Sequence, residues 1–92
     1  MNTEKEAVKE VVVSNQTGLH ARPASVFVQK ANQFASDIRV HFQGKTVNAK
    51  SIIEILTLGA GKGSKIQIKA EGEDAVEAVR ELARYVEEKM SG

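Results

Sequence analysis

The apolar residues of this chain switch repeatedly between two spacings, and the order of these spacings restricts the fold more than any other feature. Over residues 38–42 and again over 65–70, apolar and polar side chains alternate, which is typical of half-buried strands. Over residues 21–35 and 75–86 they recur every three or four positions, which predicts helices with one apolar face. The expected core residues of these helices are Ala24, Phe27, Val28, Ala31, Phe34, Ala75, Val79, Leu82 and Val86.

Shorter signals predict two further strands. The run Val11–Val13 indicates a first strand by its β-propensity, although Val12 interrupts the alternation. The dipeptide Gln43-Gly44 predicts a tight hairpin turn that leads into a strand over residues 45–48. The first half of the chain therefore reads strand, helix, strand, strand.

Two helix starts have candidate capping residues. Ser51 is followed three positions later by Glu54, which is the pattern of a capping box and predicts a short helix that stops at Gly59. As an N-cap, Ser51 would stabilise that helix by about 1 kcal/mol. Asp74 is expected to cap the last helix in the same way.

The resulting order, βαββαβα, belongs to the α+β class and predicts a two-layer open-faced sandwich with the helices on one face of a four-stranded sheet. The first two strands, joined across a helix, should run in the same direction through a right-handed crossover. A strand inserted between them would make the sheet fully antiparallel, and the spacing pattern alone leaves the strand order open. The 92 residues fit one domain, in which residues 1–7 form an extension to which we assign no role.

The composition argues against several classes of function. The 13 basic and 12 acidic residues leave a net charge of +1, and with no Trp and one Tyr there is no aromatic platform for nucleic acid. Without cysteine the chain has neither a disulfide framework nor a thiolate metal site, and we expect no metal and no cofactor. A charged start without a long apolar run predicts a cytoplasmic protein that does not insert into a membrane.

One histidine, His20, lies at the expected start of the first helix, in the segment 18–24, which reads GLHARPA. Pro23 fits the first turn of a helix, where its missing N–H breaks no hydrogen bond. Gly18 can adopt the positive φ that the preceding turn needs. The His20 ring would then lie beside unpaired helix amides and the guanidinium of Arg22, which favours binding of a phosphoryl group. The alternative is that His20 is only a helix cap or a solvated turn residue.

The chemistry of such a site follows from the imidazole. A neutral ring nitrogen can attack phosphorus, and the positive charges around His20 would stabilise the phosphorylated product. A phosphoramidate on the ring is labile, so the group can be passed to another acceptor. The sequence therefore predicts a phosphohistidine site.

Two other signals resemble functional sites but are set aside. The segment 59–64 is rich in glycine around Lys62, but a phosphate-binding P-loop lies between a strand and a following helix. Here a helix precedes the segment and a strand follows it, so we interpret it as a mobile connection. His41 points outward from its strand without a cluster of ligands, so it predicts no metal site.

The short helix after Ser51 carries more apolar residues than its core face needs. Ile55 and Leu58 can supply that face. Ile52, Ile53 and Leu56 would then leave an apolar patch near His20, which is typical of an interaction site. The alternative is that one or two of them complete the core.

Two separated motifs resemble HPr, the family of histidine-containing phosphocarriers of the bacterial phosphoenolpyruvate:sugar phosphotransferase system. The first is the segment 17–24, TGLHARPA, and the second is the segment 47–52, VNAKSI, continued by Leu58-Gly59. The resemblance runs from about Val8 to the end of the chain. It implies an antiparallel open-faced βαββαβα sandwich with three helices on one face, in agreement with the order derived above.

The resemblance also implies roles for individual residues. His20 would accept a phosphoryl group from enzyme I and donate it to a sugar-specific enzyme IIA, and Arg22 would assist. Ser51 matches the regulatory serine that a kinase/phosphorylase modifies and that a catabolite-control transcription factor recognises in some relatives. The residues expected to dock partner proteins are Thr17, Ile52, Ile53 and Leu56. The chain would be a monomeric, stoichiometric phosphoryl carrier and not an enzyme.

Two alternatives remain open at this stage. The first is a regulatory paralogue that acts through Ser51 on a transcription factor or in nitrogen control, although paralogues without transfer activity usually lose the histidine present here as His20. The second is an α+β binding domain without covalent chemistry. Glu54, where relatives often have a small residue, departs from the family pattern and puts a carboxylate near any phosphate on Ser51.

Overall fold

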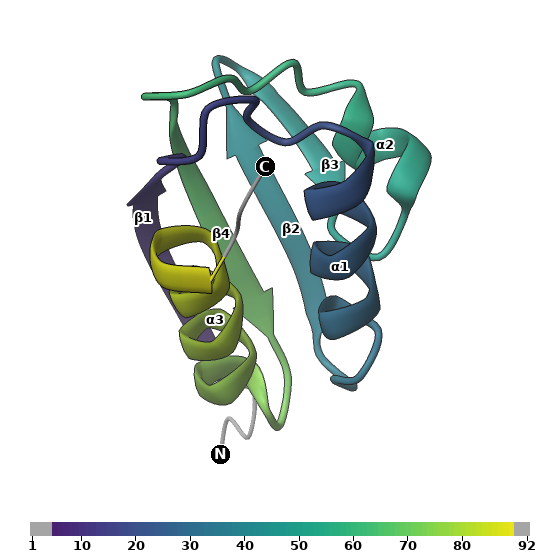
Figure 1. Ribbon diagram of the computed structural model, residues 1–92. Coiled ribbons are helices and arrows are strands. Elements are labelled where there is room, and N and C mark those ends of the chain that lie inside the picture. Colours follow the sequence, from purple (N-terminus) through teal and green to yellow (C-terminus); the bar gives the residue numbers. More distant parts are fainter. Residues whose placement is uncertain (1–4, 90–92) are drawn as a thin grey trace.

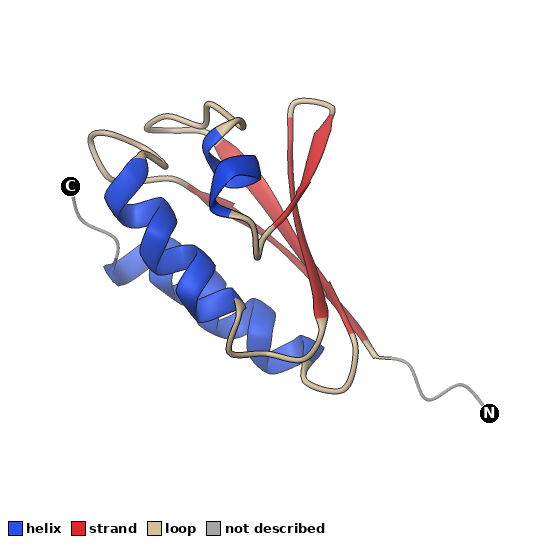
Figure 2. Cartoon of the chain, turned by 90° about the vertical axis from the view of Figure 1, so that its right-hand side faces the viewer, coloured by secondary structure: helices blue, strands red, loops and turns tan. Residues whose placement is uncertain are grey.

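The computed structural model describes residues 5–89 and has two layers, with a sheet on one side and the helices on the other (Figures 1 and 2). None of the helices in this range is both long and apolar enough to cross a membrane. The elements are β1 (Glu6–Val12), α1 (Ala21–Ala31), β2 (Asp37–Phe42), β3 (Lys45–Asn48), α2 (Ile52–Leu56), β4 (Lys65–Glu71), α3 (Ala75–Arg84) and a π-helical turn, Tyr85–Lys89, that continues α3.

The four strands form one antiparallel sheet in the order β1-β4-β2-β3. β4 lies between β1 and β2, which resolves the strand order that the spacing pattern left open. The hairpin predicted at Gln43-Gly44 is present, and both residues have positive φ, 50° and 79°. The predicted fold class, an α+β open-faced sandwich, is confirmed.

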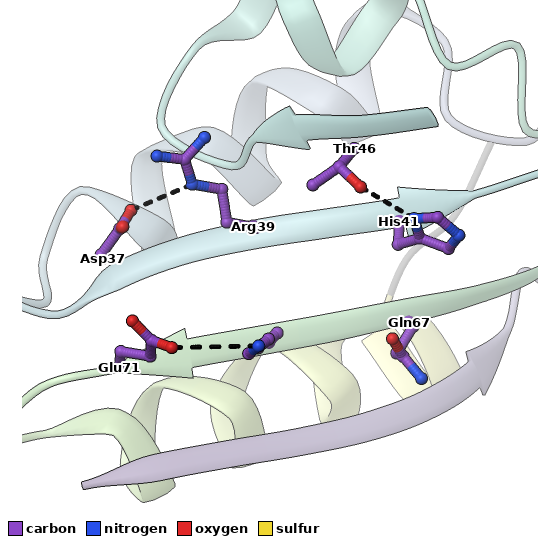
Figure 3. Close-up of a pocket in the computed structure, with 7 residues that line it drawn as sticks. Asp37, Arg39, His41, Thr46, Gln67 and Glu71 are labelled. Atoms are coloured by element: carbon purple, nitrogen blue, oxygen red, sulfur yellow. Dashed lines mark hydrogen bonds and ion pairs between the residues drawn. The ribbon is translucent and has the colours of Figure 1, made fainter. Parts of the chain in front are cut away.

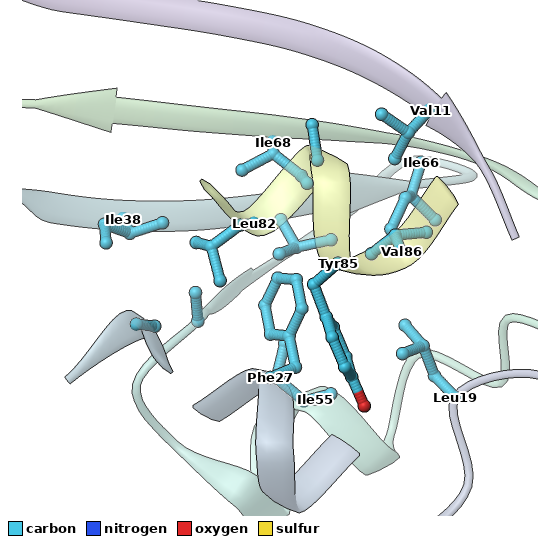
Figure 4. Packing of buried hydrophobic residues seen from close by; sticks show 14 of the residues in the cluster. Val11, Leu19, Phe27, Ile38, Ile55, Ile66, Ile68, Leu82, Tyr85 and Val86 are labelled. Carbon is cyan, nitrogen blue, oxygen red and sulfur yellow. The ribbon is translucent and has the colours of Figure 1, made fainter. Parts of the chain in front are cut away.

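The core lies between the sheet and the helices, as the two spacings predicted (Figure 4). In β2 and β4 the alternate residues facing the helices are buried, while their neighbours are exposed. Val11 and Val13 are buried and Val12 is exposed, so the run 11–13 at the end of the first strand does alternate. All four predicted core residues of the last helical stretch are buried: Ala75, Val79, Leu82 and Val86.

Two element boundaries differ from the sequence prediction. β1 begins at Glu6, because residues 6 and 7 pair with Glu71 and Ala70 of β4; only residues 1–4 of the expected extension lie outside the described range. α1 ends at Ala31 rather than near residue 35. After Asn32 the backbone bonds change to a tighter spacing, since the N–H groups of Gln33 and Phe34 donate to carbonyl oxygens only three residues back, at 3.1 and 3.2 Å.

Asp74 does not cap its own helix, contrary to the prediction, because its carboxylate bonds a different connection. It accepts from the backbone N–H of Ala35 at 2.8 Å, from that of Ser36 at 3.0 Å, and from the Ser36 hydroxyl. The hydrogen bond from Ser36 is the main cause that lowers the pKa of Asp74. Asp74 therefore ties the α1–β2 connection to the start of α3.

Acidification should weaken this link. Because the pKa of Asp74 is lower in the folded state, its stabilisation is complete above its ordinary value of 3.8 and is lost as the pH falls through the folded value. We expect Asp74→Asn to lower the urea midpoint at pH 7, with a smaller difference from the parental protein at about pH 2. The control is Asp37→Asn, whose ion pair with Arg39 is exposed. If Asp74→Asn lowers the urea midpoint equally at both pH values, this role of Asp74 is contradicted.

Candidate functional site

His20 is the N-cap residue of α1, with extended backbone angles (φ −89°, ψ −171°) and an exposed side chain. The helix begins there because the His20 carbonyl oxygen accepts the N–H of Ala24 at 2.9 Å. The imidazole does not cap the helix, and the first turn contains no acidic residue. The positive end of an 11-residue helix therefore lies next to an accessible ring.

Arg22 is also exposed, one position into the helix after Ala21. Within residues 5–89, neither its guanidinium nor the His20 ring takes part in a hydrogen bond or an ion pair. Both side chains are therefore accessible at the start of the helix.

The start of α1 is anchored from the far end of the chain. Tyr85 is buried, and its hydroxyl donates to the Pro23 carbonyl oxygen at 3.3 Å across 62 residues of sequence. Burial raises the pKa of the Tyr85 phenol. The Pro23 side chain is itself fully buried. The helix that begins at His20 is therefore fixed in place by α3 and its extension (Figure 4).

The turn before His20 is closed by Asn15, a residue that no sequence motif singles out. The Asn15 side-chain amide donates to the Gly18 carbonyl oxygen at 2.8 Å, and the Gly18 N–H donates to the Asn15 carbonyl oxygen at 3.3 Å. The polar residues before His20 are typical of a turn. Which atoms Asn15 bonds, however, depends on how residues 15–18 fold.

Gly18 meets a second segment, at Ala60. Its φ is +68°, as expected, and a Cβ atom added there would lie 2.4 Å from the Ala60 carbonyl oxygen. The same oxygen accepts the N–H of Leu19 at 2.9 Å. Only glycine fits this position, because the two backbones approach so closely.

The segment 59–64 is consequently not the mobile connection that the sequence predicted. Besides the bond at Ala60, the Gly63 N–H donates to the Val13 carbonyl oxygen at 2.7 Å and the Val13 N–H donates to that of Ser64 at 2.9 Å. The glycines allow the segment to run along the chain that leads to His20, which no local motif signals.

A shallow depression lies beside His20. Its lining includes Thr17, Leu56 and the segment 59–61. The structure thus brings one end of α2 next to His20, and the two helices pack side by side near the start of α1 (Figure 1). Ser51, Ile52 and Ile53 are outside the lining.

Ser51 is the N-cap of α2, as predicted, and its hydroxyl accepts the N–H of Glu54 at 3.3 Å. The second bond of the predicted capping box, from the Ser51 N–H to the Glu54 carboxylate, is not formed. The Glu54 carboxylate instead accepts the N–H of Asn48 at 2.9 Å, and the Ser51 N–H donates to the Asn48 carbonyl oxygen. The helix also ends at Leu56 rather than near Gly59.

The apolar residues of α2 and of the turn after it divide as predicted except for Ile52. Ile55 and Leu58 are buried, whereas Ile53 is 73% and Leu56 is 41% exposed. Ile52 is partly buried and packs against the core. Ile53 and Leu56 therefore form an accessible apolar patch, and Ile52 contributes mainly to the core.

The second histidine lies away from this site, on the open face of the sheet. His41 Nδ1 and Thr46 Oγ1 are hydrogen-bonded at 2.8 Å across β2 and β3 (Figure 3). They line a wide hollow together with charged side chains such as Lys69 and Glu71, which form an ion pair. Across the described part of the chain, His, Asp and Glu side chains nowhere gather in a group that could hold a metal ion.

Comparison with known proteins adds independent information. A family model described as "PTS HPr component phosphorylation site" matches residues 7–88. The phosphocarrier protein HPr of Buchnera aphidicola is 48% identical over 80 residues, which cover 87% of this chain and 94% of that protein. The HPr-like protein Crh of Bacillus subtilis is 46% identical over 82 residues, covering 89% and 96%. The crystal structure of HPr from Bacillus anthracis superposes with a TM-score of 0.86 at 54% identity, covering 89% of this chain and 98% of that one.

The close approach at Gly18 can be tested with a matched pair of glycines. Gly59 has the same φ of +68°, but a Cβ atom there would meet nothing within 4 Å. Gly59→Ala should therefore lower the free energy of unfolding by about 1–2 kcal/mol, the cost of the left-handed backbone. Gly18→Ala should cost about 1–3 kcal/mol more, because the methyl group crowds Ala60. Urea unfolding measures both, and equal losses would refute the crowding argument.

Proposed function

This chain belongs to the HPr family, and from that premise we propose that it carries phosphoryl groups on His20 in the phosphoenolpyruvate:sugar phosphotransferase system. Proteins of this family are phosphocarriers and not catalysts in themselves. In the proposed cycle His20 accepts a phosphoryl group from phospho-enzyme I and donates it to a sugar-specific enzyme IIA.

The observation that supports this proposal most directly is the exposed His20 ring at the N-terminus of α1. A ring nitrogen attacks phosphorus with its lone pair, the bond from phosphorus to the donor breaks, and a nitrogen–phosphorus bond forms. The helix amides and the guanidinium of Arg22 would stabilise the phosphoryl oxygens, since the start of α1 offers N–H donors and Arg22, two positions after His20, offers a positive charge. Arg22 suits this role because its planar fork can donate to two oxygens at once.

We assign partner docking to the surface around His20. Leu56 and Thr17 line the depression next to the ring, and Ile53 is the most exposed large apolar residue of the described range. Apolar side chains of this kind, next to the reacting group, suit a protein partner that must bring its own phosphoryl site to His20. Ile52 would contribute through its partly exposed surface.

Ser51 supports a regulatory role of the same surface. Its hydroxyl caps α2 and it is only half-buried, so modification by a kinase/phosphorylase would add charge at a helix start. The 46% identity with the HPr-like protein Crh favours a second candidate function, a regulatory paralogue that acts through Ser51 on a transcription factor. The presence of His20 favours the carrier.

The carrier proposal predicts one phosphate adduct. After incubation with phosphoenolpyruvate and enzyme I, mass spectrometry should find one added phosphate that acid removes, because phosphohistidine is acid-labile. His20→Ala should abolish it without loss of the fold, since the side chain is exposed. His41→Ala is the matched control, because His41 is an exposed histidine on the open face, and it should keep the adduct. An adduct retained by His20→Ala would exclude His20 as the acceptor.

The regulatory proposal predicts that charge at Ser51 opposes transfer. With a cognate kinase and ATP or pyrophosphate, Ser51 should gain an acid-stable phosphate. Ser51→Asp should slow phosphorylation of His20 by enzyme I about tenfold, or about 1.4 kcal/mol of barrier, because the new charge lies on the docking helix. Thr46→Asp adds the same charge on the open face and serves as the control. If rapid-quench kinetics gives equal rates of His20 phosphorylation for both variants, Ser51 does not belong to the docking surface.

A further inference from the structure

We infer that Asn15 is a positioning residue for His20, whose side-chain amide fixes the turn that presents the imidazole. The expected effect on phosphoryl transfer rests on the proposed function. The expected effect on the backbone of residues 15–20 does not depend on it. Asn15 lies five positions before His20 and does not line the depression next to the ring. Any effect on His20 must therefore pass through the chain between them.

The contacts of Asn15 close this turn on itself. Its Nδ2 donates to the Gly18 carbonyl oxygen at 2.8 Å and approaches Thr17 Oγ1 at 3.4 Å. The reciprocal backbone bond from the Gly18 N–H to the Asn15 carbonyl oxygen is longer, at 3.3 Å. The shortest bond across the turn is thus the one that the side chain makes, and it is buried.

A second set of contacts holds the same turn from the other side. The Leu19 N–H donates to the Ala60 carbonyl oxygen at 2.9 Å, directly after Gly18, and a Cβ atom added at Gly18 would overlap Ala60 and Gly61. The backbone that leads into His20 is therefore held between Asn15 and the segment 59–61. If the Asn15 bond is removed, one of these two restraints is lost, and the ring is less well aligned with the helix amides and Arg22.

The side chain of Asn15 is largely shielded from solvent, which strengthens its hold on the turn. Asn15 is 8% exposed, and within the described residues its Oδ1 is buried without a hydrogen-bond partner. The shorter of the two bonds that its amide donates goes to the Gly18 carbonyl oxygen, two residues before His20. A buried bond of this kind holds its partner more firmly than an exposed one, because water does not compete for it.

The test is Asn15→Leu, which keeps the branched shape of the side chain and the net charge but removes the donor. Asn32→Leu is the matched control, because Asn32 Nδ2 also donates to two oxygens, the backbone carbonyl oxygens of Val28 and Lys50, at the other end of α1. We expect Asn15→Leu to lower kcat for transfer from phospho-enzyme I about tenfold with little change in KM, since the docking residues are intact. We expect Asn32→Leu to transfer at the parental rate.

Hydrogen exchange of the Leu19 amide supplies a readout that does not depend on transfer. In Asn15→Leu this amide should exchange at least severalfold faster than in the parental protein, because its bond to Ala60 loses the support of the closed turn. Asn32→Leu should leave it unchanged. Asn15→Ala replaces the leucine variant if thermal unfolding shows that leucine is not accommodated.

The outcomes separate the two proposals. If the parental protein gains no acid-labile phosphate, the proposed function fails, and Leu19 exchange still decides whether Asn15 fixes the turn. If the adduct forms and Asn15→Leu transfers at the parental rate, the positioning role is refuted. If Asn15→Leu and Asn32→Leu lose stability and transfer in equal proportion, Asn15 is only structural and the inference is likewise refuted.

Discussion

The insertion of β4 between β1 and β2 is the constraint on which the rest of the structure depends. Because the pairing is antiparallel, the end of β1 at Val12 lies beside the start of β4 at Lys65. The chain that leaves β1 and the chain that enters β4 therefore run next to each other, and they exchange the backbone bonds at Val13 and Leu19. The turn that presents His20 is thus supported by a segment about forty residues later, and sheet order determines the candidate site.

Much of this molecule could be predicted from the sequence because burial in sheets and helices is periodic. Alternating apolar residues correctly predicted the buried faces of β2 and β4. Apolar residues three or four positions apart did the same for α3. The capping predictions failed where a polar side chain bonds a segment outside its own helix. Asp74 and Glu54 both match local capping patterns, yet their carboxylates bond the amides of Ser36 and Asn48. Partner choice of this kind depends on the tertiary path, as it does for Asn15.

The candidate site was likewise predictable where its residues depend on local sequence signals. The position of His20 at a helix start follows from local signals, such as Pro23 in the first turn, and the structure agrees. The close approach of Gly18 to Ala60 has no local signal, because it joins two loops. The two proposed roles meet at α2, because this helix begins at the Ser51 cap and ends at Leu56 beside His20.

The bond between Tyr85 and Pro23 has a practical consequence for spectroscopy. The chain has one tyrosine and no tryptophan, so its near-ultraviolet absorbance and its intrinsic emission arise almost entirely from the Tyr85 phenol. That phenol donates to a carbonyl in the first turn of α1, three residues after His20. The protein therefore contains a built-in optical reporter at the helix start, which requires no label and no substitution.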